Sequence, residues 1–123
     1  MTTIPEITCQ ELQVRLAQSP RLRLLETLPR EYFVKVHLPG AENLPLTGFD
    51  ERVLALVPDK AAEIVTYCSG PTCANSHLAA RRLLELGYQR VRAFTGGKSA
   101  WRDAGLPFES EEAVATSEHA LSP

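Results

Sequence analysis

The sequence predicts a single α/β domain whose mostly parallel sheet is covered by helices on both faces. Apolar, strand-like runs alternate with segments of helical spacing along nearly the whole chain. The run at 63–67 is apolar, rich in β-branched residues and bounded by turn residues, which is typical of a strand buried on both faces. A chain of 123 residues with 44% hydrophobic residues has the size and composition of one self-sufficient domain.

The first half of the chain is predicted to contain short elements. Thr8 and Glu11 have the spacing of a capping box, which predicts a helix over 8–18. The next segments are predicted, in order, to be a strand over 22–26, a helix over 30–36, a turn over 37–41, a very short strand over 42–44 and a helical stretch that ends before Pro58.

The second half has clearer patterns. A loop follows the strand at 63–67, and apolar residues then recur at helical spacing over 74–86 until Gly87. A strand over 90–94 leads through Gly96 and Gly97 into a last short helix. We expect the domain to span residues 1–109 and the acidic segment 110–123, which has few large apolar residues, to be a loose tail.

Composition limits the classes of partner. The formal net charge of -2 argues against nucleic acid or an anionic membrane as the main partner. The first residues do not resemble a secretory signal, and no apolar stretch has the length needed to span a bilayer. Three cysteines, Cys9, Cys68 and Cys73, are too few for a disulfide framework, so we expect a reducing, cytoplasmic location.

Cys68 is the candidate nucleophile, because it directly follows the strand at 63–67 and precedes a helix. In an open parallel sheet, ligands bind outside the carboxyl ends of the strands. Backbone N–H groups of the loop and the positive end of the helix dipole should stabilise a thiolate there and lower its pKa. The alternative is a thiol that merely packs as a small hydrophobic group. The expected substrate-binding loop comprises Ser69, Gly70, Pro71, Thr72, Cys73 and Ala74.

Three segments of the chain resemble, in order, the signatures of the rhodanese-like domains, a sulfurtransferase family. They are the His-Leu-Pro-Gly-Ala turn with its short strand at 37–45, the strand and helix at 64–68 and 79–88, and the Gly-Gly-Lys-Ser-Ala-Trp motif with its continuation at 96–107. The resemblance runs from about residue 7 to residue 109.

This resemblance implies a five-stranded, mostly parallel sheet flanked by helices and a two-step reaction. The Cys68 thiolate would take a sulfane sulfur from a donor such as thiosulfate, and the persulfide would pass it to cyanide, a thiol or a sulfur-carrier protein. The resemblance implies no metal and no organic cofactor.

The loop departs from the family pattern, because it has no Arg or Lys where the family places a basic residue after its cysteine. Lys98, at the same end of the sheet, is expected either to supply the missing charge to the substrate or to be an ordinary solvated lysine. At 26–28 the family often has Asp-x-Arg, whereas this chain has Glu-Thr-Leu. Arg30 either replaces that arginine or lies at the surface.

Cys73 is the second departure. It follows Cys68 closely in one tight loop, so it either acts as a resolving thiol or packs at the start of the helix. Cys9, in the first helix, is expected to be structural. His77 is expected to be a polar residue near a helix start, and His37 to fix its turn by hydrogen bonds.

Three other functions have different requirements. A phosphatase or arsenate reductase of this fold needs an arginine where the loop has Ala74. A zinc site would use Cys68, Cys73 and His77, but the sequence offers no fourth ligand. The main alternative is a protein sulfur relay or a non-catalytic, redox-regulatory module that keeps the fold.

Overall fold

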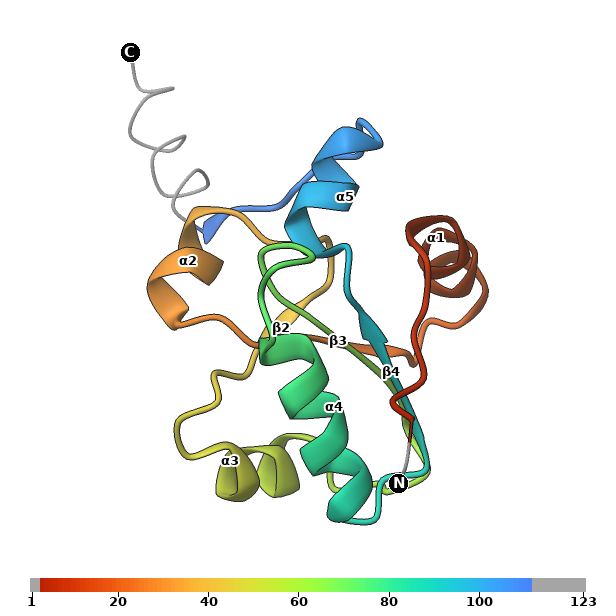
Figure 1. Cartoon of the computed structure of the whole chain (residues 1–123), viewed down its shortest axis with the longest axis vertical. Coiled ribbons are helices and arrows are strands. Elements are labelled where there is room, and N and C mark those ends of the chain that lie inside the picture. Colours follow the sequence, from red (N-terminus) through yellow and green to blue (C-terminus); the bar gives the residue numbers. More distant parts are fainter. Residues whose placement is uncertain (1–2, 112–123) are drawn as a thin grey trace.

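A computed structural model describes residues 3–111 of the chain and contains one parallel sheet with the strand order β2-β1-β3-β4 (Figure 1). The strands are β1 (Arg23–Glu26), β2 (Glu42–Asn43), β3 (Glu63–Tyr67) and β4 (Arg90–Phe94). The helices are α1 (Cys9–Gln18), α2 (Arg30–Lys35), α3 (Phe49–Leu56), α4 (Asn75–Glu85) and α5 (Gly97–Asp103). The order of elements along the chain agrees with the prediction.

The predicted fold class is confirmed, but the prediction of five strands is wrong for the described residues, which form four. The segment before α1 runs along the outer edge of β4 and makes a single bridge, between Glu6 and Ala93. The backbone N–H of Ile7 donates to Ala93, and that of Ala93 donates to Pro5. Pro5 has no N–H to extend this ladder, and Thr8 already caps α1, so the pairing stays a bridge.

Two apolar cores lie on opposite faces of the sheet. Alternation along β3 sends Ile64 to the core under α3 and α4, and Val65 to the core under α1 and α5. Leu83 of α4 and Leu12 of α1 are fully buried in these two cores, and burial of such a side chain contributes about 1.5–3 kcal/mol relative to exposure. Figure 1 shows α4 and α1 on either side of the strands.

The helix ends follow the local signals. In α1 the N–H of Glu11 donates to Oγ1 of Thr8 at 3.1 Å, and the N–H of Thr8 donates to Oε1 of Glu11 at 2.9 Å, which is the predicted capping box. Gly87, with a φ of +98°, follows the end of α4. The strands β3 and β4 have the predicted bounds.

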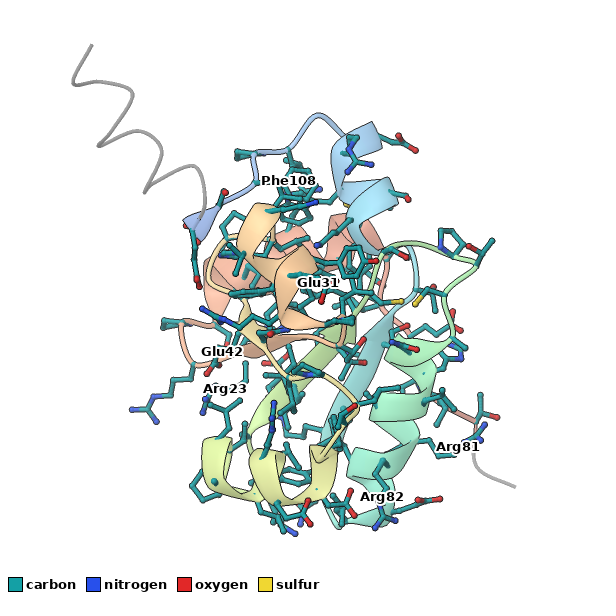
Figure 2. All side chains as sticks on the ribbon, turned by 90° about the vertical axis from the view of Figure 1, so that its left-hand side faces the viewer. Arg23, Glu31, Glu42, Arg81, Arg82 and Phe108 are labelled. Atoms are coloured by element: carbon teal, nitrogen blue, oxygen red, sulfur yellow. The ribbon has the colours of Figure 1, made fainter. Side chains whose placement is uncertain are left out.

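Charged side chains gather at the amino ends of the strands. Glu63, at the start of β3, is 9% exposed and accepts hydrogen bonds from Arg15, Arg90 and Arg92. Arg23 and Glu42 are paired at 2.7 Å, and Figure 2 shows them side by side. A cavity of about 680 Å³ opens among these groups. Because Cys68 follows the carboxyl end of β3, this cavity lies at the opposite end of the sheet.

The described part of the chain continues past the predicted boundary at 109. Oγ of Ser110 donates to the carbonyl of Val34 at 3.1 Å, and Glu111 pairs with Arg30 at 2.9 Å. The rest of the predicted loose tail lies outside the described residues. Within residues 3–111, no helix is both long and apolar enough to cross a membrane.

Candidate active-site loop

Cys68 lies at the carboxyl end of β3, a strand hydrogen-bonded to β1 on one side and β4 on the other. The side chain is almost completely buried, with 1% of the residue exposed. Since side chains alternate along a strand, Cys68 continues the face that Ile64 turns toward α4. The residues 68–74, here called the cysteine loop, connect it to that helix.

The beginning of the cysteine loop is held by the first turn of α5. The carbonyl of Cys68 accepts a hydrogen bond from the N–H of Lys98 at 3.0 Å. The carbonyl of Ser69 accepts from the N–H of Ser99 at 2.9 Å and from its hydroxyl at 3.1 Å. N–H groups in the first turn of a helix have no partner within the helix, so the bonds to the loop carbonyls satisfy the hydrogen-bonding groups of both segments.

A second set of bonds holds the loop from the side of β1. The carbonyl of Tyr67 accepts from both the N–H of Thr27, at 2.9 Å, and its hydroxyl, at 3.0 Å. Nδ2 of Asn75, at the start of α4, donates to the carbonyl of Thr27 at 3.3 Å. Three successive carbonyls, at 67–69, are therefore held away from the loop interior.

The Gly-Gly motif lets α5 approach this closely. Gly97 has a φ of +57°, and a Cβ placed there would collide with the carbonyl of Cys68 and lie 2.9 Å from the nitrogen of Gly70. At Gly70, a Cβ would lie 2.6 Å from the hydroxyl of Ser99. Gly97 is thus required by close packing against the backbone of the cysteine loop, whereas at Gly70 the side chain of Ser99 would have to move.

A tight turn brings the second cysteine back to the first. The N–H of Cys73 donates to the carbonyl of Gly70 at 3.0 Å, with Pro71 in the second position of the turn, where its fixed φ is favourable. Sγ of Cys68 donates to the carbonyl of Cys73 at 3.4 Å. Neither thiol is in a disulfide, and each affects the pKa of the other.

The electrostatics of the two thiols differ from the prediction of a lowered pKa at Cys68. Burial raises the pKa of the Cys68 thiol, the neighbouring Cys73 raises it further, and the N–H groups of Ser76 and Gly70 oppose this. At Cys73, burial also acts to raise the pKa, but the hydrogen bond from Cys68 and the N–H groups of Asn75 and Ser69 outweigh it and lower the pKa. The first thiolate of the pair therefore resides on the less buried sulfur, Cys73.

Lys98 does not present its ammonium group to the cysteine loop. Its side chain is 8% exposed, so the expectation of a solvated lysine is wrong. Nζ lies 3.1 Å from Oε2 of Glu26 and donates to the carbonyl of Tyr32 at 3.2 Å. Lys98 contacts the cysteine loop through its backbone N–H, which donates to the carbonyl of Cys68. Because Glu26 compensates the charge of the Lys98 side chain, the loop receives no net positive charge from it.

Glu26 and Tyr67 form a buried polar pair that the sequence did not reveal. Tyr67 donates its hydroxyl to Oε1 of Glu26 at 2.7 Å and accepts from the N–H of Leu38 at 3.0 Å. Oε2 of Glu26 is near Lys98 but receives no aligned hydrogen bond. Burial is the main cause that raises the pKa of Glu26. An acidic residue ending an apolar strand was the only signal for this network.

The remaining predicted residues lie outside the immediate surroundings of the thiols. His77 lies 3.0 Å from Glu6, and among residues 3–111 no group of three or more Cys, His, Asp or Glu side chains converges as a metal site. His37 fixes its turn as expected, through Nδ1 at 2.8 Å from the carbonyl of Phe33. Arg30 is a surface residue paired with Glu111.

The arrangement suits nucleophilic sulfur chemistry. Loop N–H groups approach two sulfur atoms from the start of α4, where the helix dipole also favours negative charge. Pro71 and Thr72 are exposed, whereas Cys68 lies beneath them. Cys73 is half-buried and is therefore the more accessible of the two sulfurs.

A family model described as "Rhodanese-like domain" matches residues 8–104. The chain is 29% identical over 109 residues to a sulfurtransferase from Allochromatium vinosum, covering 89% of this chain and 98% of that protein. It is 33% identical over 103 residues to the HTH-type transcriptional regulator Rv0324 from Mycobacterium tuberculosis, covering 84% of this chain and 44% of the regulator. The structure superposes on a thiosulfate sulfurtransferase from Pseudomonas aeruginosa with a TM-score of 0.78 and 24% identity, covering 88% and 20% of the two chains, which shows a common fold.

Proposed function

Because the chain belongs to the rhodanese-like domain family, we propose that it is a sulfurtransferase that carries a sulfane sulfur as a persulfide on Cys68. The observation that carries this proposal is the position of Cys68, buried at the carboxyl end of β3 under N–H groups from the start of α4. The name of the Allochromatium vinosum relative, which the chain matches over nearly its full length, supports the same reaction class.

The proposed loading step is a nucleophilic substitution on sulfur. The Cys68 thiolate attacks the outer sulfur of thiosulfate, an S–S bond forms at Sγ, and the S–S bond of the donor breaks with its electron pair leaving on sulfite. With a persulfide donor, the leaving group is the corresponding thiolate. In the second step a thiol, cyanide or a sulfur-carrier protein takes the outer sulfur and restores the Cys68 thiolate.

Cys73 supports the loading step as a proton acceptor. Cys73 is the more acidic of the two thiols, and its backbone carbonyl lies 3.4 Å from Sγ of Cys68, so a Cys73 thiolate is a neighbouring acceptor for the proton that leaves Cys68. The N–H groups of Gly70 and Ser76 then stabilise negative charge on the sulfur of Cys68. No metal or organic cofactor takes part in the proposed step.

The uncharged loop favours donors of low charge. The cysteine loop contains no Arg or Lys, and the charge of Lys98 is compensated by Glu26. Thiosulfate has two negative charges on its reacting group and therefore gains little electrostatic attraction, whereas the reacting group of a persulfide donor has at most one negative charge and needs less. We propose a small persulfide as the better donor and a thiol or carrier protein as the acceptor, in a reducing, cytoplasmic setting that keeps the three free thiols reduced.

Intact mass measurement tests this function. The reduced protein is incubated with thiosulfate or with glutathione persulfide, quenched with acid and weighed, beside Cys68→Ser, Cys73→Ser and Cys9→Ser. We expect one added sulfur on Cys73→Ser, either an added sulfur or a Cys68–Cys73 disulfide on the wild type and Cys9→Ser, and no change in Cys68→Ser. Failure of Cys73→Ser to gain sulfur from either donor, or an equal gain in Cys68→Ser, would contradict Cys68 as the carrier.

A second candidate function is a regulatory or relay module, which the same uncharged loop favours. The chain spans 44% of the mycobacterial regulator that it resembles, so a similar domain occurs beside another domain in that protein. In this case the protein would accept sulfur without multiple turnover. Steady-state assays with cyanide or a thiol acceptor separate the two functions, since only an enzyme releases many equivalents of product per chain.

A further inference from the structure

The cysteine loop places a second thiol directly against the sulfur that would carry the persulfide. The turn from Gly70 to Cys73 folds the chain back, and Sγ of Cys68 donates to the carbonyl of Cys73 at 3.4 Å. The two thiols are therefore neighbours in one short turn, and each affects the pKa of the other. Cys9, the third cysteine, lies in α1, on the other face of the sheet from α4, and cannot take part.

We propose that Cys73 discharges the Cys68 persulfide inside the loop, so that the protein releases hydrosulfide and closes a Cys68–Cys73 disulfide. This inference rests on the proposed function, because it starts from the Cys68 persulfide. It adds a reductive activity, in which a sulfane sulfur leaves as sulfide instead of being passed on as sulfane sulfur.

The step balances without an external oxidant. The Cys73 thiol, losing its proton, attacks Sγ of Cys68, an S–S bond forms between the two cysteines, and the bond from Sγ to the outer sulfur breaks. The electron pair and the proton leave with the outer sulfur as hydrosulfide. The two cysteines are oxidised to a disulfide while the sulfane sulfur is reduced to sulfide. A low-molecular-weight thiol or dithiol then restores the reduced loop.

Geometry selects the inner sulfur as the point of attack. The backbone carbonyl of Cys73 lies 3.4 Å from Sγ of Cys68, which becomes the inner sulfur after loading, so residue 73 is held beside that atom. The outer sulfur is added beyond Sγ and must extend away from it. Attack on the outer sulfur would only move the persulfide to Cys73, whereas attack on the nearer Sγ expels it as hydrosulfide.

The nucleophile and its surroundings suit this step. Cys73 is the less buried of the two thiols, and the N–H groups of Asn75 and Ser69 with the bond from Cys68 hold its pKa below the ordinary value. A thiolate is the attacking form in thiol–disulfide exchange. The second half of the loop is held chiefly by the Gly70–Cys73 turn, so it has room to adjust while the new bond forms.

A single-turnover experiment without an acceptor tests the proposal. The reduced wild type, Cys73→Ser, Cys73→Ala and the control Cys9→Ser are mixed with thiosulfate or, in a separate reaction, with glutathione persulfide, and each reaction is quenched with acid within seconds. Released sulfide is measured colorimetrically, and the protein is examined by intact mass and peptide mapping. Two substitutions at position 73 separate loss of the thiol from an effect of one particular side chain.

We expect the wild type and Cys9→Ser to release about one equivalent of sulfide, lose the mass of two hydrogens and yield a Cys68–Cys73 peptide. Both Cys73 variants should instead gain the mass of one sulfur and release at least tenfold less sulfide. A wild type that keeps the added sulfur as a stable persulfide would overturn the proposal and leave the sulfurtransferase function intact. If neither the wild type nor the Cys73 variants accept sulfur from thiosulfate or glutathione persulfide, the proposed function itself fails, and this inference with it.

Discussion

Nζ of Lys98 lies 3.1 Å from Oε2 of Glu26, with 8% and 0% of the two side chains exposed. Tyr67 donates to the other oxygen of Glu26, so α5, β1 and β3 meet in one buried polar contact beside the cysteine loop. A charge left alone in such surroundings costs far more than the pair contributes. We therefore expect substitution of Lys98 to affect the free energy of unfolding more than the binding of a donor.

Replacing only one member of this pair should destabilise the protein strongly. We expect Lys98→Met or Glu26→Gln to lower the free energy of unfolding by roughly 3–5 kcal/mol, because each leaves an uncompensated buried partner. The double variant should recover most of the loss. Urea unfolding of the four proteins provides the double-mutant cycle. Additive losses in the double variant would show that the two side chains do not act as a pair.

The two thiols should titrate as a coupled pair. Burial first, and Cys73 second, raise the pKa of Cys68, so Cys73→Ala should lower that pKa. We expect iodoacetamide alkylation of Cys68, followed by peptide mass spectrometry, to shift to lower pH in Cys73→Ala and to stay unchanged in Cys9→Ser. A shift to higher pH would contradict the proposed coupling.

Gly97 should be intolerant of any side chain. A Cβ there would collide with the carbonyl of Cys68, and its φ of +57° is unfavourable for other residues. Gly105, with a φ of +73° and no atom within 4 Å of the added Cβ, is a matched control. We expect Gly105→Ala to cost about 1–2 kcal/mol for backbone conformation alone and to keep sulfur loading. Gly97→Ala should cost more and slow loading at least tenfold, measured by urea unfolding and intact mass.

Adding positive charge to the cysteine loop should improve the use of thiosulfate. Ser69 is exposed and follows the candidate nucleophile, so Ser69→Arg brings a guanidinium group to a dianionic donor. We expect the thiosulfate concentration for half-maximal loading to fall severalfold, and the gain to shrink as salt is raised. Ser69→Gln controls for side-chain size, and an equal gain in that variant would exclude charge as the cause.

Glu63 should make the protein sensitive to acid. Hydrogen bonds from Arg15 are the main cause that lowers the pKa of Glu63 below its usual 4.5. A lowered folded-state pKa contributes stability above the unfolded pKa, which is lost as pH falls through the folded pKa. We expect Glu63→Gln to cost about 1–3 kcal/mol at pH 7 and progressively less below pH 4.5, measured by urea unfolding. Glu51→Gln, an exposed change on α3, should show no such convergence.

The fold was predictable where local patterns are strong. The strands at 63–67 and 90–94 have the predicted bounds, because apolar runs and turn residues mark both ends. The position of Cys68 after a buried strand followed from the same pattern. The prediction of a fifth strand was wrong because the segment beside β4 contains Pro5, which lacks the N–H needed to extend the pairing beyond a single bridge.

The electrostatics of the site were not predictable from sequence. The helix dipole suggested an acidic Cys68, but burial acts against the thiolate, and the burial of a side chain depends on tertiary packing. Lys98 was expected at the surface or toward substrate, because its partner Glu26 comes from a distant segment. Such long-range pairs leave no local pattern in the sequence.

The two halves of the cysteine loop are anchored very differently, and this bears on how the domain can diversify. Positions 67–69 are bound through their backbone carbonyls to β1 or α5, so a change of backbone conformation there would disturb the carboxyl end of the sheet. Positions 71–74 are tied down mainly by one turn bond and the start of α4. The residues that maintain the fold, 67–69, thus directly precede the residues that can vary with the substrate, 71–74. A randomised library confined to 71–74 could explore new donors and acceptors while the rest of the chain stays fixed.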